Sequence, residues 1–98
     1  MKNPIADLNK IFDSRIRLGV MSLLVVNVKI SFNELKEMLA LTDGNLASHL
    51  STLEQAQYLN VNKSFIGRKT NTTYGITPLG KQAFKIHLDA LEKMIKNV

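Results

Sequence analysis

The sequence predicts a single α+β domain that is mostly helical, and three observations lead to this prediction. Two apolar-periodic segments with clear start signals follow one another closely between Ser31 and Tyr58. Two β-prone runs come next, with the polar run 67–71 between them, and a long amphipathic segment from Pro78 closes the chain. Because 98 residues can build one modest core and not two, we expect residues 1–98 to form one domain.

The composition excludes several functional classes. Hydrophobic residues make up 45% and charged residues 21%, as in ordinary globular proteins. The longest aliphatic run, Leu23 to Val26, is far shorter than the ~20 residues of a membrane span, and the N-terminus lacks a signal-peptide apolar region. Without cysteine there is no thiolate metal site, and His49 and His87 do not have metal-ligand spacing. We therefore expect a cytoplasmic protein with no membrane partner, metal or cofactor.

The sequence pattern of the N-terminal third predicts two helices. Asn3-Pro4 is a helix-start signal, and a short helix is expected to follow it, with an apolar stripe of Ile5, Leu8, Ile11 and Phe12. A second helix, from Arg15 to about Asn27, is apolar on nearly all faces. Such a helix is typically buried, so we expect a central core helix with Arg15 and Arg17 at its exposed start.

The next two segments predict a helix-turn-helix. Ser31 and Glu34 have the spacing of a capping box, and the helix they open is expected to bury Phe32, Leu35, Met38 and Leu39. Only Ala40 and Leu41 then precede Thr42, which can cap the following helix. Two short helices joined by so tight a turn form a helix-turn-helix, although an αα-hairpin in any small bundle remains the alternative.

The helix expected at about 43–56 has two contrasting faces. Leu46, Leu50 and Leu53 form one stripe for the core. The opposite face carries only small or uncharged polar residues, namely Gly44, Asn45, Ser48, Ser51, Thr52 and Gln55. Solvated helix faces usually carry Lys and Glu instead, whereas short hydrogen-bonding side chains suit a major groove about 12 Å wide. We therefore predict a DNA recognition helix.

The β-prone runs predict a hairpin with a basic tip. Leu59, Val61 and Phe65 precede the run 67–71, and Tyr74 and Ile76 follow it. From Gln55 to Leu88 the chain has no acidic residue and five basic ones, Lys63, Arg68, Lys69, Lys81 and Lys85, which equals the net charge of +5. This segment is expected to meet a phosphate backbone, with solubility as the neutral explanation. Lys63, Arg68 and Lys69 favour phosphate or minor-groove contact.

Thr77-Pro78 predicts the start of a last helix that is roughly 31 Å long. Its apolar residues Phe84, Leu88, Leu91, Ile95 and Val98 have the spacing of a coiled-coil seam. We expect this helix and the first one to form a two-fold dimer interface through Ile5, Leu8, Phe12, Phe84, Leu88, Leu91 and Ile95. The alternative is that the last helix folds back onto the first.

Helix, helix-turn-helix, basic hairpin and helix is the order of a winged helix. The segments LTDGNLASHLSTLEQAQYL and VNKSFIGRKTNTTYGITPLGKQAF closely resemble the small winged-helix transcriptional regulators related to the MarR-like and ArsR-like families. The resemblance extends from about Arg15 to Phe84. It implies a DNA-binding regulator, usually a dimer, with helix 43–56 in the major groove and the wing, residues 63–73, on the backbone or in the minor groove.

The resemblance also implies which residues contact DNA. Gly44, Asn45, Ser48, His49 and Thr52 match the groove-facing part of the recognition helix, and Arg68, Lys69 and Thr70 match the wing. We add Thr42 and Lys63 to the expected contacts. One departure is Gln57, which stands where such sequences commonly place the glycine that ends this helix. A left-handed residue other than glycine costs roughly 1 kcal/mol, so we expect a less sharp helix end.

Two function classes remain. His49 is expected to be packed or bonded to phosphate, and the eight acidic residues form no carboxylate pair for catalysis, so we predict no enzyme. The first class is a sequence-specific DNA-binding transcriptional regulator acting as a homodimer. The alternative is a winged-helix module that binds another protein through the hairpin and the recognition face. No effector pocket is evident from the sequence.

Overall fold

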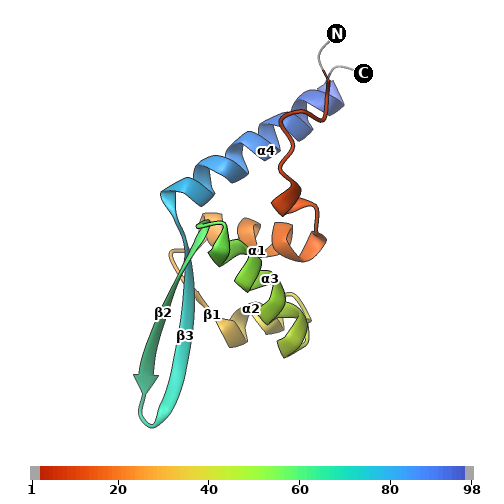
Figure 1. Cartoon of the computed structure of the whole chain (residues 1–98). Helices are drawn as coiled ribbons and strands as arrows, with labels where there is room; N and C mark the ends of the chain where they lie inside the picture. Colours follow the sequence, from red (N-terminus) through yellow and green to blue (C-terminus); the bar gives the residue numbers. More distant parts are fainter. Residues whose placement is uncertain (1–2, 97–98) are drawn as a thin grey trace.

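The computed structural model describes residues 3–96. It contains η1 (Lys10–Phe12), α1 (Arg15–Val26), β1 (Ile30–Ser31), α2 (Phe32–Met38), α3 (Asp43–Gln55), β2 (Leu59–Ile66), β3 (Lys69–Ile76) and α4 (Pro78–Lys96). The β2–β3 hairpin projects beside the cluster of α1, α2 and α3, and α4 extends at the opposite end (Figure 1). This is the winged-helix arrangement that the sequence predicted. No helix among the described residues is long and apolar enough to cross a membrane.

The helix starts follow their sequence signals. Ser31 Oγ accepts from the Glu34 N–H, and the Glu34 carboxylate accepts from the Ser31 N–H, both at 3.1 Å, so the capping box of α2 is confirmed. Thr42 caps α3. Thr77 Oγ1 accepts from the Gly80 N–H at 2.9 Å and so caps α4. These local hydrogen bonds fix where the helices begin.

The core lies between η1, the helices α1, α2 and α3, the sheet and the first half of α4. Its largest fully buried side chains are Phe12, Val20, Met21, Leu24, Leu35, Leu46, Leu50 and Leu53. Two expectations of burial are wrong. Met38 is exposed, and α1 is not buried all round, because Val26 at its end is 76% exposed. Phe32 and Leu39 are half-buried against the core.

The sheet has three antiparallel strands in the order β1-β3-β2, instead of the two predicted. The two-residue strand β1 pairs with β3 through Ile30↔Tyr74, and it is too short to leave a periodic signal. The hairpin is paired along its length, up to Ile66↔Lys69. The run 67–71 is therefore not a loop, since only Gly67 and Arg68 form the turn. Gly67 has φ +63°, as the first central residue of a type II′ turn requires.

The prediction of an N-terminal helix is wrong. Residues 4–7 form turns, and between residues 3 and 14 the 3₁₀ turn η1 is the only helical element. Asn9 is the reason, because it is held extended by three hydrogen bonds. Its side-chain oxygen accepts from the Ile11 N–H at 2.9 Å, its amide donates to Tyr58 Oη at 2.8 Å, and its N–H donates to His87 Nδ1 at 3.0 Å. Contacts with distant elements here override the local start signal.

The first half of α4 packs on its own chain. Phe12 is 1% exposed, and its ring centroid lies 5.4 Å from that of Phe84 and 5.1 Å from that of His87. Buried positions continue along α4 to Ala90, in line with the alternative that this helix folds back on the N-terminal segment. Leu88 and Ile95, in contrast, are 43% and 75% exposed. Val98, the last residue of the predicted seam, lies outside the described residues.

The end of α3 is sharp, so the expectation of a looser end is wrong. Gln57 adopts φ +64°, the Tyr58 N–H donates to the Leu53 carbonyl at 3.0 Å, and the Gln57 N–H donates to the Glu54 carbonyl at 2.9 Å. These two bonds form a Schellman motif, in which a left-handed residue closes the helix. The turn between α2 and α3 repeats it with Ala40 at φ +53°.

Candidate nucleic-acid interface

Helix α3 separates an apolar inner face from a polar outer face. Leu46, Leu50 and Leu53 are at most 1% exposed, as predicted. On the outer face Gly44, Asn45, Ser48, Ser51 and Gln55 are exposed, and Thr52 is half-buried. None of these side chains carries a charge. A helix anchored by three buried leucines thus presents short hydrogen-bonding groups to solvent along its length.

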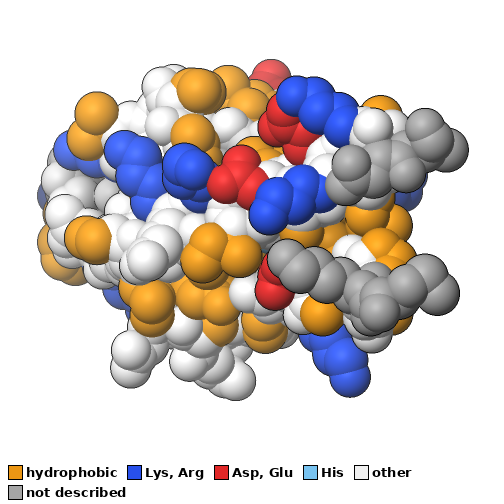
Figure 2. Space-filling model, turned by 90° about the horizontal axis from the view of Figure 1, so that it is seen from above, with side chains coloured by type: hydrophobic (Ala, Val, Ile, Leu, Met, Phe, Trp, Pro, Cys, Tyr) orange, Lys and Arg blue, Asp and Glu red, His pale blue; other side chains and the backbone are white. Residues whose placement is uncertain are grey.

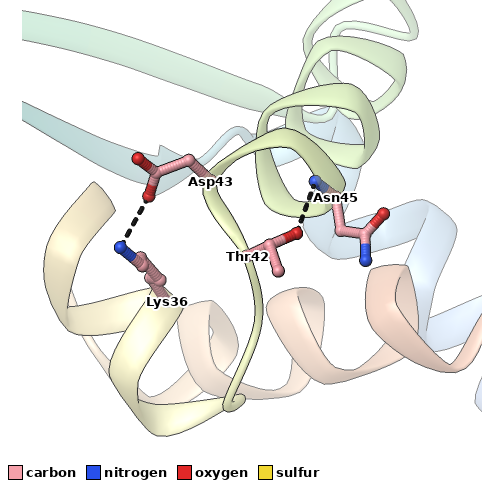
Figure 3. A network of polar contacts seen from close by, with 4 residues as sticks. All are labelled: Lys36, Thr42, Asp43 and Asn45. Atoms are coloured by element: carbon pink, nitrogen blue, oxygen red, sulfur yellow. Dashed lines mark hydrogen bonds and ion pairs between the residues drawn. The ribbon is translucent and has the colours of Figure 1, made fainter.

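The start of this face is held by two contacts that Figure 3 shows. Thr42 Oγ1 accepts from the Asn45 N–H at 3.3 Å, which leaves the Thr42 hydroxyl proton free to donate. Lys36 Nζ lies 2.7 Å from Asp43 Oδ1, so α2 supplies a cation to the one carboxylate at this end of α3. The side-chain amide of Asn45 points away from the Thr42 cap (Figure 3). It is therefore free to meet a ligand.

Further along the face, the polar groups are only weakly engaged. Thr52 Oγ1 donates to the Ser48 carbonyl at 3.3 Å, and the Gln55 amide donates to Ser51 Oγ at 3.4 Å. Both bonds are long for an oxygen acceptor, so these side chains can exchange them for contacts with a partner. Ser48 Oγ makes no hydrogen bond with another described residue.

His49 lies at the margin of this face and is held by Arg17 of α1. The Arg17 Nε–H donates to the Ile11 carbonyl at 2.5 Å, and Arg17 Nη1 lies 2.8 Å from His49 Nδ1. A guanidinium can only donate, so Nδ1 accepts and the ring proton sits on Nε2. Burial, followed by the nearby charge of Arg17, lowers the pKa of His49 below its ordinary value of 6.5.

The Nε2–H of His49 is consequently a single donor open to solvent. It has no partner in the described part of the chain, where every buried side-chain polar atom does have one. The sequence placed His49 correctly at the edge of the core. It placed Arg17 at an exposed helix start, whereas Arg17 is a half-buried tether between η1, α1 and α3. An arginine within an apolar helix was the available signal for this role.

The wing carries cations that are free. Lys63, Arg68 and Lys69 are exposed and form no ion pair within residues 3–96, and Thr70 beside them is also exposed. Lys81 and Lys85 lie instead on α4, where Lys85 pairs with Asp89 at 3.0 Å. The basic segment is thus divided between two elements, the wing and α4. Its contact with phosphate stays a prediction.

Helix α4 has a face of a different character. Charged side chains run in a band across the view from above, with hydrophobic side chains on both sides (Figure 2). Ion pairs Lys85–Asp89 and Glu92–Lys96 lie along α4. An open groove of about 720 Å³ lies between α4 and the end of α1, and its apolar lining comprises Val25, Pro78, Phe84 and Leu88.

Comparison with known proteins decides the family. The profile of the family described as winged helix DNA-binding domain matches residues 16–95. The chain belongs to this family. An uncharacterized protein of Methanocaldococcus jannaschii is 39% identical over 89 residues, which cover 91% of this chain and 97% of the relative. The winged-helix resemblance seen in the sequence is confirmed.

Solved structures agree with this assignment. The structure of a transcriptional regulator homologue from Pyrococcus horikoshii OT3 matches with a TM-score of 0.77 and 32% identity, covering 93% of this chain and 95% of that one. The YusO protein of Bacillus subtilis matches with a TM-score of 0.81, covering 96% of this chain and 66% of that one. Its 15% identity shows a shared fold alone. The chain is thus a winged-helix domain of the DNA-binding regulator type.

Proposed function

We propose that this winged-helix protein is a sequence-specific transcriptional regulator that acts in the cytoplasm as a homodimer on double-stranded DNA. The observation that carries the proposal is the outer face of α3, where uncharged side chains of groove-fitting size lie beside a hairpin with three cations that have no ion pair within residues 3–96. A helix face that meets only solvent usually carries Lys and Glu pairs. The 32% identical structure described as a transcriptional regulator homologue supports the same function.

The outer face of α3 would recognise the DNA sequence. Asn45, Ser48 and Thr52 can each donate and accept, so they suit base edges in the major groove, where a good contact discriminates by roughly 1 to 3 kcal/mol. Gly44 has no side chain, so DNA can approach the backbone of α3 closely at this position. The space beside it is open, because an added Cβ would have no neighbour within 4 Å in the free protein. The Nε2–H of His49 and the hydroxyl of Thr42 are donors at the margins, suited to a phosphate or a base acceptor.

The wing supplies sequence-independent attraction. Lys63, Arg68 and Lys69, with the hydroxyl of Thr70, would contact the phosphate backbone or the minor groove. Phosphate contacts position a protein on DNA without reading its sequence, and removing any one of them changes the salt dependence of binding. The two elements therefore make separable contributions to binding.

Dimerisation is proposed through α4 and the N-terminal segment. Phe12 and Phe84 belong to the core of a single chain, so the interface would be formed by Ile5, Leu8, Leu88, Leu91 and Ile95. Leu88→Glu with Leu91→Glu should give a monomer in sedimentation analysis, whereas Lys93→Glu on the charged face should remain a dimer. An unmodified chain that is monomeric at tens of micromolar would rule out the interface.

The test of function is selection of binding sites from random DNA, followed by anisotropy titrations at several salt concentrations. A two-fold dimer should select an inverted repeat with half-sites about 10 to 10.5 bp apart, or a multiple of this spacing. Selected sites without symmetry would contradict the dimeric mode. A protein that enriches no sequence and shows no salt-dependent binding to mixed DNA would support the protein-binding alternative instead.

A further inference from the structure

The tip of the wing carries two apolar side chains that no other described residue covers. Phe65 is 76% exposed and Ile66 is 68% exposed, and they are the last two residues of β2. On this strand every residue from Asn62 to Ile66 is exposed, so the core ends well before the tip. The register places Phe65 opposite Thr70 and Ile66 opposite Lys69. Because successive strand residues point to opposite faces, the tip is apolar on both sides of the hairpin.

The surroundings of these side chains point to an anionic partner. Arg68 is in the turn directly after them, Lys69 lies across from Ile66, and Lys63 lies on the same face as Phe65. No acidic residue occurs between Gln55 and Leu88. The positively charged tips of two copies of this chain would repel each other. The charge therefore disfavours association with the wing of a second copy. The partner must offer both negative charge and an apolar surface.

Phosphates alone do not meet this requirement, whereas the minor groove does. Its walls of sugars and stacked bases offer apolar surface, and its negative potential attracts arginine. Phe and Ile are among the side chains that proteins insert between base steps from this groove, which unstacks the step and bends the duplex. A groove about 6 Å wide excludes a whole hairpin but admits single side chains that project from its tip.

The hairpin presents its tip in a position that fits this role. Strand β2 is roughly 26 Å long, at 3.3 Å for each of its eight residues, and its part from Asn62 to Ile66 projects from the core. The II′ turn at Gly67 and the paired strands fix the backbone from which the tip side chains project. The tip and the first turn of α3 lie toward the same end of the molecule, away from the far end of α4 (Figure 1). One duplex could therefore meet both.

We infer that Phe65 and Ile66 insert into the minor groove beside the sequence read by α3, with Arg68 holding the groove, and that binding bends the DNA. The inference deepens the proposed function and rests on it. It gives the wing a contribution to DNA affinity that does not depend on charge.

The test is the double variant Phe65→Ala with Ile66→Ala on DNA that the unmodified protein binds. We expect affinity to fall about 10- to 30-fold, the effect of removing an anchoring apolar side chain, with the salt slope unchanged because the cations that face phosphate are all kept. Energy transfer between dyes at the two ends of the duplex should report a smaller bend. A 2-aminopurine at the unstacked step should brighten with the unmodified protein and stay quenched with the variant.

Two controls make the result specific. Val28→Ala removes an apolar side chain that is 94% exposed but lies between α1 and β1, so it should bind and bend DNA normally. Thermal unfolding of the double variant should match that of the unmodified protein, because neither side chain is packed.

Three outcomes overturn the inference. The first is a double variant that bends and unstacks DNA like the unmodified protein, and the second is an equal loss of affinity in Val28→Ala. The third is binding to phosphatidylserine vesicles that needs Phe65 and Ile66 while DNA binding does not. If the unmodified protein binds no DNA at all, the proposed function itself has failed, which is a distinguishable result.

Discussion

Helix α3 and the wing are both proposed to touch DNA, but the chain holds them in different ways. Three buried leucines, a threonine cap and a Schellman motif fix α3 in the core. The wing is held mainly by the cross-strand pairing of β2 with β3, since no residue of β2 beyond Val61 is buried or half-buried. A rigidly placed helix can direct short side chains at base edges, where hydrogen bonds need accurate distances and angles. The attraction between the cations of a projecting hairpin and phosphates tolerates a wider range of positions.

The largest expected effect contrasts the two regions directly. Leu50→Ala on the inner face of α3 should cost about 2 to 5 kcal/mol of unfolding free energy, because it leaves a cavity in the core. Ile66→Ala at the tip of the wing should change stability by no more than about 0.5 kcal/mol. Urea denaturation of both variants measures the difference. Similar losses would mean that the wing is as firmly packed as the helix.

The second prediction concerns the point where α3, the wing and α4 meet. A Cβ on Gly80 would overlap the Tyr58 carbonyl oxygen, which also accepts from the Thr77 N–H at 3.0 Å. Gly80→Ala should therefore cost about 1 to 3 kcal/mol, despite the better helix propensity of alanine. Gly44→Ala in the first turn of α3 is the matched control, since an added Cβ meets nothing there. Equal stability of the two variants would refute this close approach.

The third prediction is a gain in stability at the boundary between α3 and β2. Gln57 is left-handed with φ +64°, so Gln57→Gly should relieve strain and raise the free energy of unfolding by a few tenths to about 1 kcal/mol. Its neighbour Ala56 is right-handed, and Ala56→Gly should lower it instead. Opposite shifts of the two melting temperatures would support the Schellman end of α3. A loss with Gln57→Gly would contradict it.

The fourth prediction concerns pH and has the smallest expected effect. The pKa of His49 is lowered mainly by burial and further by Arg17, so the folded protein favours the neutral ring. The stabilisation from this preference is complete above the ordinary pKa of 6.5 and is lost as pH falls below it. Between pH 7 and pH 5.5 the unmodified protein should therefore lose more stability than His49→Gln. Parallel pH profiles would show that His49 does not contribute.

Local signals explain what the sequence predicted well. The caps at Ser31, Thr42 and Thr77 act over three residues, and the leucine stripe of α3 follows the helical period, so each is visible in a short window of sequence. For the same reason the polar outer face of α3 followed directly from the position of its inner face.

Long-range interactions explain what was missed. The bond from Asn9 to His87 joins residues 78 positions apart and replaces the expected N-terminal helix with a turn. Arg17 and His49 are 32 positions apart, so no local pattern pairs them. The two-residue strand β1 acquires its identity only from pairing with β3. Side chains that hold the interface in place were thus harder to find than side chains that form it.

The most direct test of the account compares Asn45→Ala with Lys69→Ala, each measured on the selected site and on mixed DNA over a range of salt. Asn45→Ala should weaken the selected site far more than mixed DNA. Lys69→Ala should weaken both nearly alike and flatten the plot of log affinity against log salt by about 0.9 for each phosphate that is no longer neutralised, nearly twice that in a dimer. An unchanged salt slope for Lys69→Ala, or equal losses on both DNAs for Asn45→Ala, would contradict the division of roles between helix and wing.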